Sequence, residues 1–268
     1  MNLGRRPVVI MTLLVMLSGC ATLPNGQRWG ENATLTPGWD RVETAARKAV
    51  LAPQTWAPLA GAAVFRLTDW DGRVSSWAVN HHPVFGSTSN ASSASDTLAY
   101  SSGAIWALTA LATPSGESAD PWLLNKVKGV AVQGSSIFAA QGMSEGLKRL
   151  THRPRPDHSD NMSFPSGHAT AVASFTTLSY RNLETLPLSD REKLAAGIGL
   201  GGMAVATGWA RIESENHYPS DVLTGFAIGY FFSSFFNDAF LGLDDHAPLR
   251  STLDLSSKGA VIGIAGSF

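Results

Sequence analysis

Three long stretches without a charged residue constrain the fold of this chain more than any other feature. They cover residues 129–144, 194–210 and 222–237, and each is 16 or 17 residues long and interrupted by Gly, Ser, Thr or Gln. A membrane span usually needs about 20 predominantly apolar residues. The stretches are therefore more typical of helices that are apolar on most faces and buried against one another. We expect an all-α chain built on a helical bundle of about five to six helices.

Start signals divide the chain from residue 97 onward into helices. Ser189 is followed three residues later by Glu192, a pattern typical of a capping box. Pro121 and Pro219 suit the first turn of a helix. The predicted helices span residues 97–113, 121–151, 166–181, 189–211 and 219–241. The main domain is expected to cover residues 96–241.

The flanking regions are expected to be less regular. Residues 20–95 should form a tether and an irregular N-terminal region, with a short helix near residues 39–51 and a turn at residues 69–72 between short extended pieces. The Ser-rich segment 86–96 is interpreted as a solvated linker, with a lid near a site as the alternative. The short C-terminal tail, residues 242–268, holds one apolar run that suits a strand or an irregular cover.

The N-terminus has the layout of a secretory signal. Arg5 and Arg6 precede a mostly apolar run of ten residues, and the sequence Leu-Ser-Gly-Cys ends at Cys20, the single cysteine. This sequence resembles the lipobox of bacterial lipoproteins, in which the cysteine is lipidated and becomes the first mature residue. An ordinary signal peptide that ends near a cysteine is the alternative. We expect residues 1–19 to be removed and Cys20 to anchor the protein at the periplasmic face of the outer membrane, because Ala21 rather than aspartate follows.

Composition excludes two classes of protein. Hydrophobic residues make up 44% of the chain and charged residues 15%, against about 25% charged residues in typical globular domains. The chain is therefore not a charged, disordered polymer. With 20 basic and 21 acidic residues the net charge is -1, which gives no indication of a nucleic-acid-binding surface.

Two segments near the middle of the chain carry residues suited to an anion. In the first, Lys148 lies seven residues before Arg155, and Pro156 follows at the end of a predicted helix. Taken alone, this pattern is a basic helix C-terminus that complements the helix dipole. The second segment, residues 164–168, reads Phe-Pro-Ser-Gly-His. Ser166 can cap the helix that follows, and the exposed amides of a first helical turn favour an anion.

A third segment places a histidine near a carboxylate. Arg211 is followed by His217 and, four residues later, by Asp221 at a predicted helix start. This spacing lets the carboxylate orient the imidazole. Taken alone, the pair is a structural hydrogen bond.

Together, in order and spacing, the three segments resemble the KxxxxxxRP, PSGH and SRxxxxxHxxxD motifs of the type 2 phosphatidic acid phosphatase superfamily. That superfamily also contains bacterial class A acid phosphatases and vanadium-dependent haloperoxidases. The resemblance covers residues 148–221, and the first 95 residues lie outside it. One departure is Ala210, which stands where the third motif has serine. The resemblance implies a helical bundle with its site at one end.

The resemblance also implies the part that each residue plays. His217 is expected to attack phosphorus and become phosphohistidine, Asp221 to hold the other ring nitrogen, and His168 to protonate the leaving oxygen and then activate water. Three cations and a helix N-terminus suit the phosphoryl oxygens. The phosphate-binding residues are expected to be Lys148, Arg155, Ser166, Gly167 and Arg211.

A metal centre is the competing interpretation of the same residues. His168, His217 and Asp221 could form a two-histidine, one-carboxylate set. The three neighbouring cations would repel a divalent ion. We therefore expect no metal and no other cofactor.

The expected function is that of a metal-independent phosphatase acting on phosphate monoesters or pyrophosphates, with membrane lipids as the preferred substrates. Its expected partners are a phosphorylated lipid or small phosphate ester and the membrane that holds the lipid anchor. The alternatives are a non-specific periplasmic acid phosphatase on soluble monoesters, a vanadate-dependent haloperoxidase and a non-catalytic envelope lipoprotein. The sequence Phe-Pro-Ser-Gly-His-Ala at residues 164–169 is closer to the lipid phosphatases than to the acid phosphatases, which usually carry Tyr-Pro-Ser-Gly-His-Thr.

Overall fold

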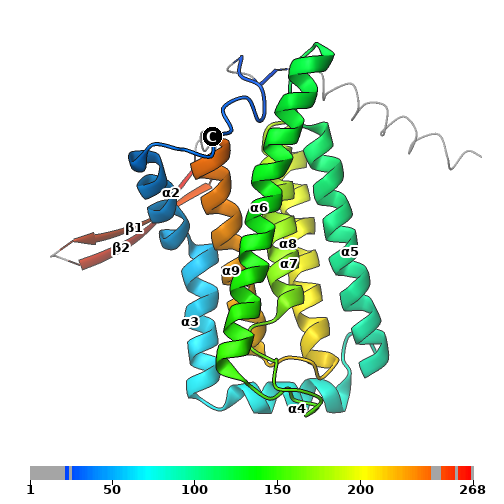
Figure 1. The fold of residues 1–268 in the computed structure, drawn as a ribbon. Coiled ribbons are helices and arrows are strands. Elements are labelled where there is room, and N and C mark those ends of the chain that lie inside the picture. The colour runs from blue at the N-terminus through cyan, green and yellow to red at the C-terminus, as the bar shows by residue number, and fades with distance from the viewer. Residues whose placement is uncertain (1–21, 24–25, 243–248, 257–258, 267–268) are drawn as a thin grey trace, which may run out of the picture.

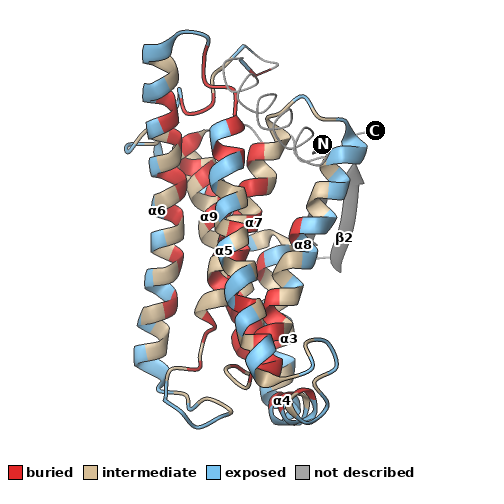
Figure 2. Cartoon of the chain, turned by 90° about the vertical axis from the view of Figure 1, so that its right-hand side faces the viewer, coloured by how far each residue is buried: buried red, intermediate tan, exposed pale blue. Residues whose placement is uncertain are grey.

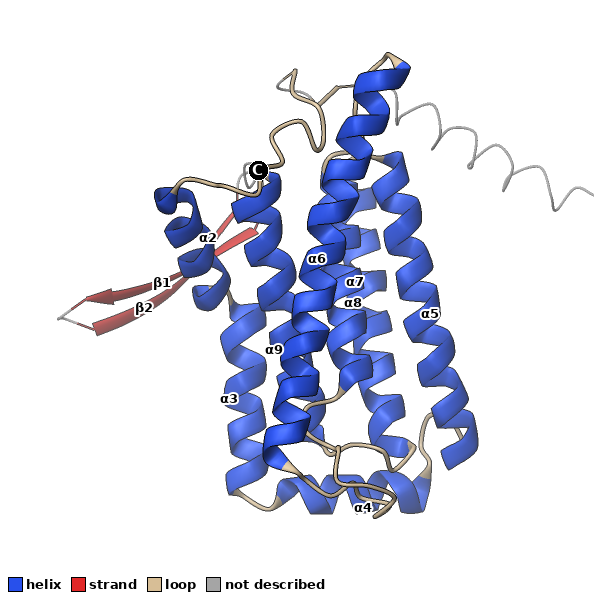
Figure 3. Cartoon of the chain, viewed as in Figure 1, coloured by secondary structure: helices blue, strands red, loops and turns tan. Residues whose placement is uncertain are grey.

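The computed structural model describes residues 22–23, 26–242, 249–256 and 259–266 (Figure 1). Cys20 and the expected signal peptide lie outside these residues. Eight α-helices make up most of the described chain: α2 (Trp39–Leu51), α3 (Pro53–Leu67), α4 (Trp70–His81), α5 (Thr88–Ala112), α6 (Ala119–Thr151), α7 (Gly167–Glu184), α8 (Asp190–Glu213) and α9 (Pro219–Phe236). A π-helical segment, Asn237–Leu241, continues α9. The strands β1 (Leu249–Ser256) and β2 (Gly259–Gly266) form an antiparallel hairpin (Figure 3).

Helices α3 and α5 to α9 run along one axis, and α4 crosses one end of this bundle (Figure 1). The buried positions of α6 face the other helices and its exposed positions face outward (Figure 2). No helix in the described part of the chain combines the length and the apolar character that crossing a membrane would require.

Two glycines of α9 allow its backbone to pack directly against the backbone of α7. A Cβ atom on Gly225 would lie 2.7 Å from the backbone oxygen of Ser166, and one on Gly229 would lie 2.4 Å from the backbone oxygen of Thr170. Both distances are shorter than a carbon and an oxygen can tolerate, so only glycine fits. This contact brings the first turns of α7 and α9 together at the end of the bundle that α4 crosses.

The five helices predicted from residue 97 onward are present as α5 to α9, with two large changes at their ends. The predicted helix 219–241 becomes π-helical from Asn237. Helix α5 begins at Thr88, nine residues before the predicted start. The Ser-rich segment is therefore helical, and its interpretation as a solvated linker was wrong. The hydroxyl groups of Ser95 and Ser102 donate to carbonyls three residues earlier, which satisfies them within the helix.

The N-terminal half is more regular than expected. The helix near residues 39–51 is present as α2, but residues 53–67 and 70–81 form α3 and α4 instead of short extended pieces. Of the turn expected at residues 69–72, only Asp69 lies outside a helix, and its φ of 57° separates α3 from α4; residues 70–72 form the first turn of α4. Alanine, the best helix former, recurs through α3, and this propensity outweighs the mixed hydrophobic pattern on which the prediction of extended chain depended.

Candidate active site

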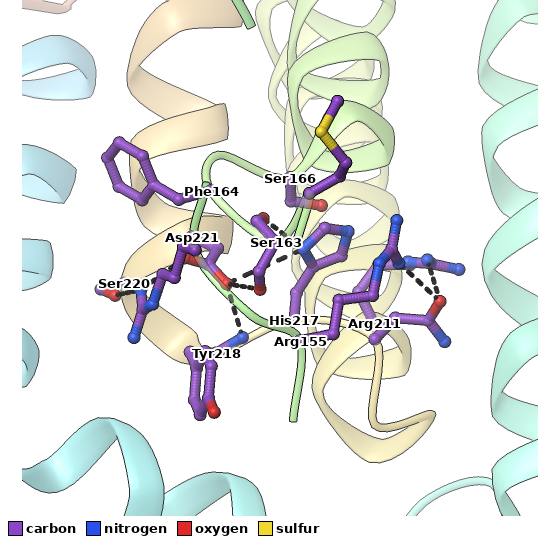
Figure 4. Close-up of polar contacts among 12 residues, drawn as sticks. Arg155, Ser163, Phe164, Ser166, Arg211, His217, Tyr218, Ser220 and Asp221 are labelled. Atoms are coloured by element: carbon purple, nitrogen blue, oxygen red, sulfur yellow. Dashed lines mark hydrogen bonds and ion pairs between the residues drawn. The ribbon is translucent and has the colours of Figure 1, made fainter. Parts of the chain in front are cut away.

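The three predicted motif segments meet at the end of the bundle that α4 crosses. The C-terminal end of α6 leads into the loop 152–166, which returns to the first turn of α7. The end of α8 leads through residues 214–218 to the first turn of α9. Figure 4 shows side chains from both connections pointing toward one another.

His217 lies at the centre of this group and is 2% exposed. Its Nδ1 atom lies 2.7 Å from the backbone oxygen of Ser163 and 3.8 Å from Oδ2 of Asp221. The motif predicted Asp221 as the hydrogen-bond partner of Nδ1. In the structure the partner is the Ser163 carbonyl instead. A carbonyl only accepts, so Nδ1 carries the hydrogen, and in the neutral ring Nε2 carries the lone pair.

Asp221 acts on His217 mainly through Ser163. Its Oδ2 atom accepts from the Ser163 hydroxyl at 2.5 Å and from the Tyr218 amide at 2.9 Å. Its Oδ1 atom accepts from Nη1 of Arg153 at 2.5 Å. These donors satisfy both oxygens of a carboxylate that is fully buried. The arrangement fixes Ser163, whose carbonyl in turn fixes the imidazole.

Burial determines the protonation state of His217. Loss of water around the ring lowers the pKa of His217 to about 4, because it disfavours the imidazolium, and the negative charge of Asp221 only partly opposes this. The ring is therefore neutral near pH 7. A neutral imidazole with a bonded Nδ1–H is the form that can act as a nucleophile through Nε2.

Two arginines lie on the opposite side of the imidazole from Ser163 (Figure 4). Oδ1 of Asn216 accepts from Nη2 of Arg211 at 2.6 Å and from Nη1 of Arg155 at 3.0 Å, so one amide oxygen holds both guanidinium groups. Burial, followed by repulsion from Arg155, lowers the pKa of Arg211 to about 10, and the group stays cationic at neutral pH. Nε of Arg211 is buried without a partner among the described residues.

Lys148 supplies a third cation from the last turn of α6. A Cβ atom on Gly167 would lie 3.4 Å from its Nζ atom, so the ammonium group faces the start of α7. Burial lowers the pKa of Lys148, and Arg155 and Arg211 add to this effect by repulsion. An anion between these three groups would relieve that repulsion.

Ser166 and Gly167 form the N-terminus of α7, as predicted. Ser166 is fully buried, and its hydroxyl accepts from the amide of Ala169 at 3.4 Å. Its own amide donates to the backbone oxygen of Asp221, which joins the first turns of α7 and α9. Ser166 is drawn above the imidazole of His217 in the view of Figure 4.

His168 faces an acid that the sequence analysis did not identify. Its Nε2 atom lies 2.8 Å from Oδ1 of Asp96, and the two side chains are 36% and 51% exposed. Burial and the charge of Arg211 lower the pKa of His168, while Asp96 opposes them. The neighbouring Ser95 accepts from Nη1 of Arg211 at 3.2 Å. The Ser-rich segment therefore contributes directly to the site.

The structure thus brings all eight predicted catalytic and phosphate-binding residues to one end of the bundle. It adds four that were missed: Asp96, Arg153, Ser163 and Asn216. Asn216 directly precedes His217, and Arg153 lies two residues before Arg155. Their places inside the motif segments could have indicated that they belong to the site. No group of three or more His, Cys, Asp or Glu side chains is arranged to hold a metal ion within the described residues.

Comparison with known proteins gives the same region of the chain. Residues 129–241 match the PAP2 superfamily. The chain is 33% identical over 93 residues to Phosphatidylglycerophosphatase B of Bacillus subtilis, covering 32% of this chain and 46% of that protein. It is 33% identical over 108 residues to Decaprenylphosphoryl-5-phosphoribose phosphatase of Mycobacterium tuberculosis, covering 37% of this chain and 54% of that protein. This chain therefore matches about half the length of each of these relatives.

Among solved structures, a transmembrane PAP2 type phosphatidylglycerolphosphate phosphatase from Bacillus subtilis aligns with a TM-score of 0.42 at 22% identity, over 71% of this chain and 94% of that one. All three motif segments lie within residues 129–241. This part of the chain, which carries the site, is the part that matches the PAP2 superfamily.

Proposed function

We propose that the chain is a metal-independent phosphatase that cleaves phosphate monoesters or pyrophosphates of membrane lipids through a phosphohistidine. The observation that carries this proposal is the hydrogen bond from Nδ1 of His217 to the Ser163 carbonyl. It leaves the lone pair on Nε2, and the ring lies between Ser163 and the two arginines (Figure 4).

The arrangement of the three cations supports the binding of a phosphoryl group. Arg155 and Arg211 are held together by Asn216, and the unpartnered Nε of Arg211 is a buried donor ready for a phosphoryl oxygen. Lys148 faces the N-terminus of α7, where backbone amides also favour negative charge. Donors fixed in advance stabilise the charge that develops on the phosphoryl oxygens during transfer.

The proposed reaction has two steps. In the first, Nε2 of His217 attacks phosphorus, the bond from phosphorus to the leaving oxygen breaks, and His168 donates a proton to that oxygen. In the second, His168 takes a proton from water as the water oxygen attacks phosphorus. The N–P bond breaks, inorganic phosphate leaves, and both histidines return to their starting states.

Lipid substrates are proposed because both curated relatives are named for phosphorylated lipids. The sequence around Ser166 points the same way, since it resembles the lipid phosphatase form of the motif. A phosphatidate, a phosphatidylglycerol phosphate, a polyprenyl pyrophosphate and lipid A share the phosphoryl chemistry that this site can bind. Soluble phosphate monoesters are the alternative substrates, and a comparison of kcat/KM on lipid and soluble substrates distinguishes the two.

We also propose that Cys20 carries a lipid anchor that holds the site near the periplasmic face of the outer membrane. The lipobox-like sequence before Cys20 supports this. Metabolic labelling with a fatty acid tests it directly, because Cys20→Ser should abolish the label and release the protein from the membrane fraction. Labelling that persists in Cys20→Ser would contradict the anchor.

The activity is tested by phosphate release in excess EDTA from a phosphatidate dispersion and, in parallel, from an aryl phosphate. We expect the parent to be active in EDTA on both, with the higher kcat/KM on the lipid, and His217→Ala to be inactive. Activity that disappears in EDTA and returns with added metal would contradict the mechanism. A higher kcat/KM on the aryl phosphate would contradict the lipid preference.

A further inference from the structure

A chain of buried charges runs from α4 to Asp221. Nη1 of Arg153 donates to Asp221 at 2.5 Å, and its Nη2 donates to Asp71 at 2.9 Å. The guanidinium group thus links two carboxylates with its two ends. The side chains of Arg153, Asp71 and Asp221 are 12%, 6% and 0% exposed, so solvent screens these ion pairs only weakly.

Asp71 also holds the start of α9. Its Oδ1 atom accepts from the Ser220 amide at 2.9 Å, and its Oδ2 atom accepts from the Ser220 hydroxyl at 2.5 Å. The amide is one of the groups that a helix start leaves without an intrahelical acceptor. The Ser220 hydroxyl lies 2.8 Å from Nη1 of Arg153, which closes the network. Asp71 therefore sets the position of α9 and the position of Arg153 at the same time.

The plane of the guanidinium group is fixed as well. Arg153 stacks on the ring of Tyr218, with Cζ 4.2 Å from the ring centroid. Tyr218 directly follows His217 in the chain and donates its amide to Asp221. Cation–π stacking and two ion pairs together leave Arg153 a single orientation.

We infer that Asp71 and Arg153 are positioning residues for the nucleophile: they hold Asp221, which through Ser163 holds the imidazole of His217. The inference rests on the proposed function, because it assigns a task only if His217 is the nucleophile. Asp71 lies on α4, outside the residues 129–241 that match the superfamily. The N-terminal part of this chain thereby completes the site.

The chemical consequence concerns charge as well as geometry. Two carboxylates and one guanidinium give the network a net charge of -1, and the positive charge that develops on His217 during attack is stabilised by it. Asp71→Asn makes the network neutral while keeping an acceptor for the Ser220 amide. Arg153→Met breaks the link and leaves two carboxylates buried without their shared cation.

The test is steady-state kinetics of the full chain with phosphatidate or an aryl phosphate, whichever the parent hydrolyses. A misplaced nucleophile costs about a hundredfold in rate. We expect Arg153→Met to lower kcat by about that factor and Asp71→Asn by about tenfold, with KM changed less than about threefold. Arg153→Lys, which keeps the charge but cannot bridge both acids, should recover part of the loss.

A matched control separates positioning from stability. Arg181 and Asp238 form another buried ion pair, at 2.6 Å, which joins α7 to the π-helical segment at the other end of α9. Asp238→Asn should lower the melting temperature. At temperatures below its unfolding transition, this variant should keep the kcat of the parent. The double variant Asp71→Asn, Arg153→Met should be no slower than Arg153→Met alone, because the two residues act through one path.

Three results would overturn the inference. The first is a kcat of Asp71→Asn within about twofold of the parent. The second is a change in KM alone in both Asp71→Asn and Arg153→Met. The third is a loss of kcat in Asp238→Asn as large as the loss in Asp71→Asn. If Arg153→Met does not fold, Asp71→Asn and Arg153→Lys still decide the question. Failure of the proposed function is distinguishable, because His217→Ala would then stay active.

Discussion

The backbone oxygen of Ser163 accepts the Nδ1 hydrogen of His217 at 2.7 Å, and this bond determines which ring nitrogen can react. A main-chain carbonyl has one state of protonation, so it holds one tautomer of the ring at every pH at which the ring is neutral. Asp221, the acid named by the motif, reaches the ring through the Ser163 hydroxyl. Ser163 therefore touches the imidazole, and Asp221 holds Ser163 in place.

The first prediction concerns pH. The pKa of His217 is lowered to about 4, so the nucleophile is lost as pH falls through about 4. Burial and Arg211 lower the pKa of His168 below its ordinary value of 6.5, so the general acid is lost as pH rises through that lower value. We expect kcat/KM to be bell-shaped, with its maximum between about 4 and 6.5. A profile that rises steadily toward alkaline pH would contradict these assignments.

The second prediction tests Asp96. The carboxylate raises the pKa of His168 against the effect of burial, so Asp96→Asn should lower that pKa further. We expect the alkaline limb of kcat/KM to move to lower pH and the acid limb, which belongs to His217, to stay in place. Asp190→Asn, on the exposed first turn of α8, serves as the control and should leave both limbs unchanged. An unchanged alkaline limb in Asp96→Asn would exclude His168 as the group that titrates there.

The third prediction concerns Asn216, whose amide oxygen holds Arg155 and Arg211 together. Asn216→Ala should release the two guanidinium groups and lower kcat/KM about tenfold to a hundredfold. Asn216→Asp adds a negative charge where the phosphoryl group binds, so it should be worse than Asn216→Ala on a phosphate dianion. Steady-state kinetics of the two variants check this order, and the reverse order would show that Asn216 does not border the bound phosphate.

The fourth prediction concerns the packing of α7 against α9. A Cβ atom on Gly229 would lie 2.4 Å from the backbone oxygen of Thr170, so Gly229→Ala should lower the free energy of unfolding by about 1–3 kcal/mol. A Cβ atom on Gly202, in α8, would meet nothing within 4 Å. Gly202→Ala should therefore raise the free energy of unfolding by about 0.5–1 kcal/mol. Denaturant unfolding measures both, and equal effects would refute the close contact.

The sequence was sufficient for α7, α8 and α9 because each of these helices carries its own start signal. Ser189 and Glu192 form the capping box that their spacing predicted. Ser166 caps α7 as predicted. Pro53 at the first position of α3 and Ser87 as the cap of α5 are signals of the same kind that the prediction did not use. A serine in a linker and a serine inside a helix look alike in sequence. Ser95 is accommodated inside a helix because its hydroxyl donates to the carbonyl three residues earlier.

The missed site residues have a common physical explanation. Asp96 meets a histidine 72 residues later, and Asp71 meets Ser220 at a separation of 149 residues. Such contacts depend on how the bundle closes, which no local pattern contains. The motif spacing did bring His217 and Asp221 close together, but it could not show that Ser163 lies between them. Local patterns named the candidate reacting groups, and tertiary packing supplied their partners.

The most direct measurement is to trap the phosphorylated enzyme. A substrate labelled with radioactive phosphate is mixed with the parent chain in EDTA, quenched in alkali within milliseconds, and the protein-bound label is then tested for stability. We expect label that survives alkali, is lost in acid and maps to His217, and none in His217→Ala. Turnover without any protein-bound label, or label retained in His217→Ala, would contradict the account.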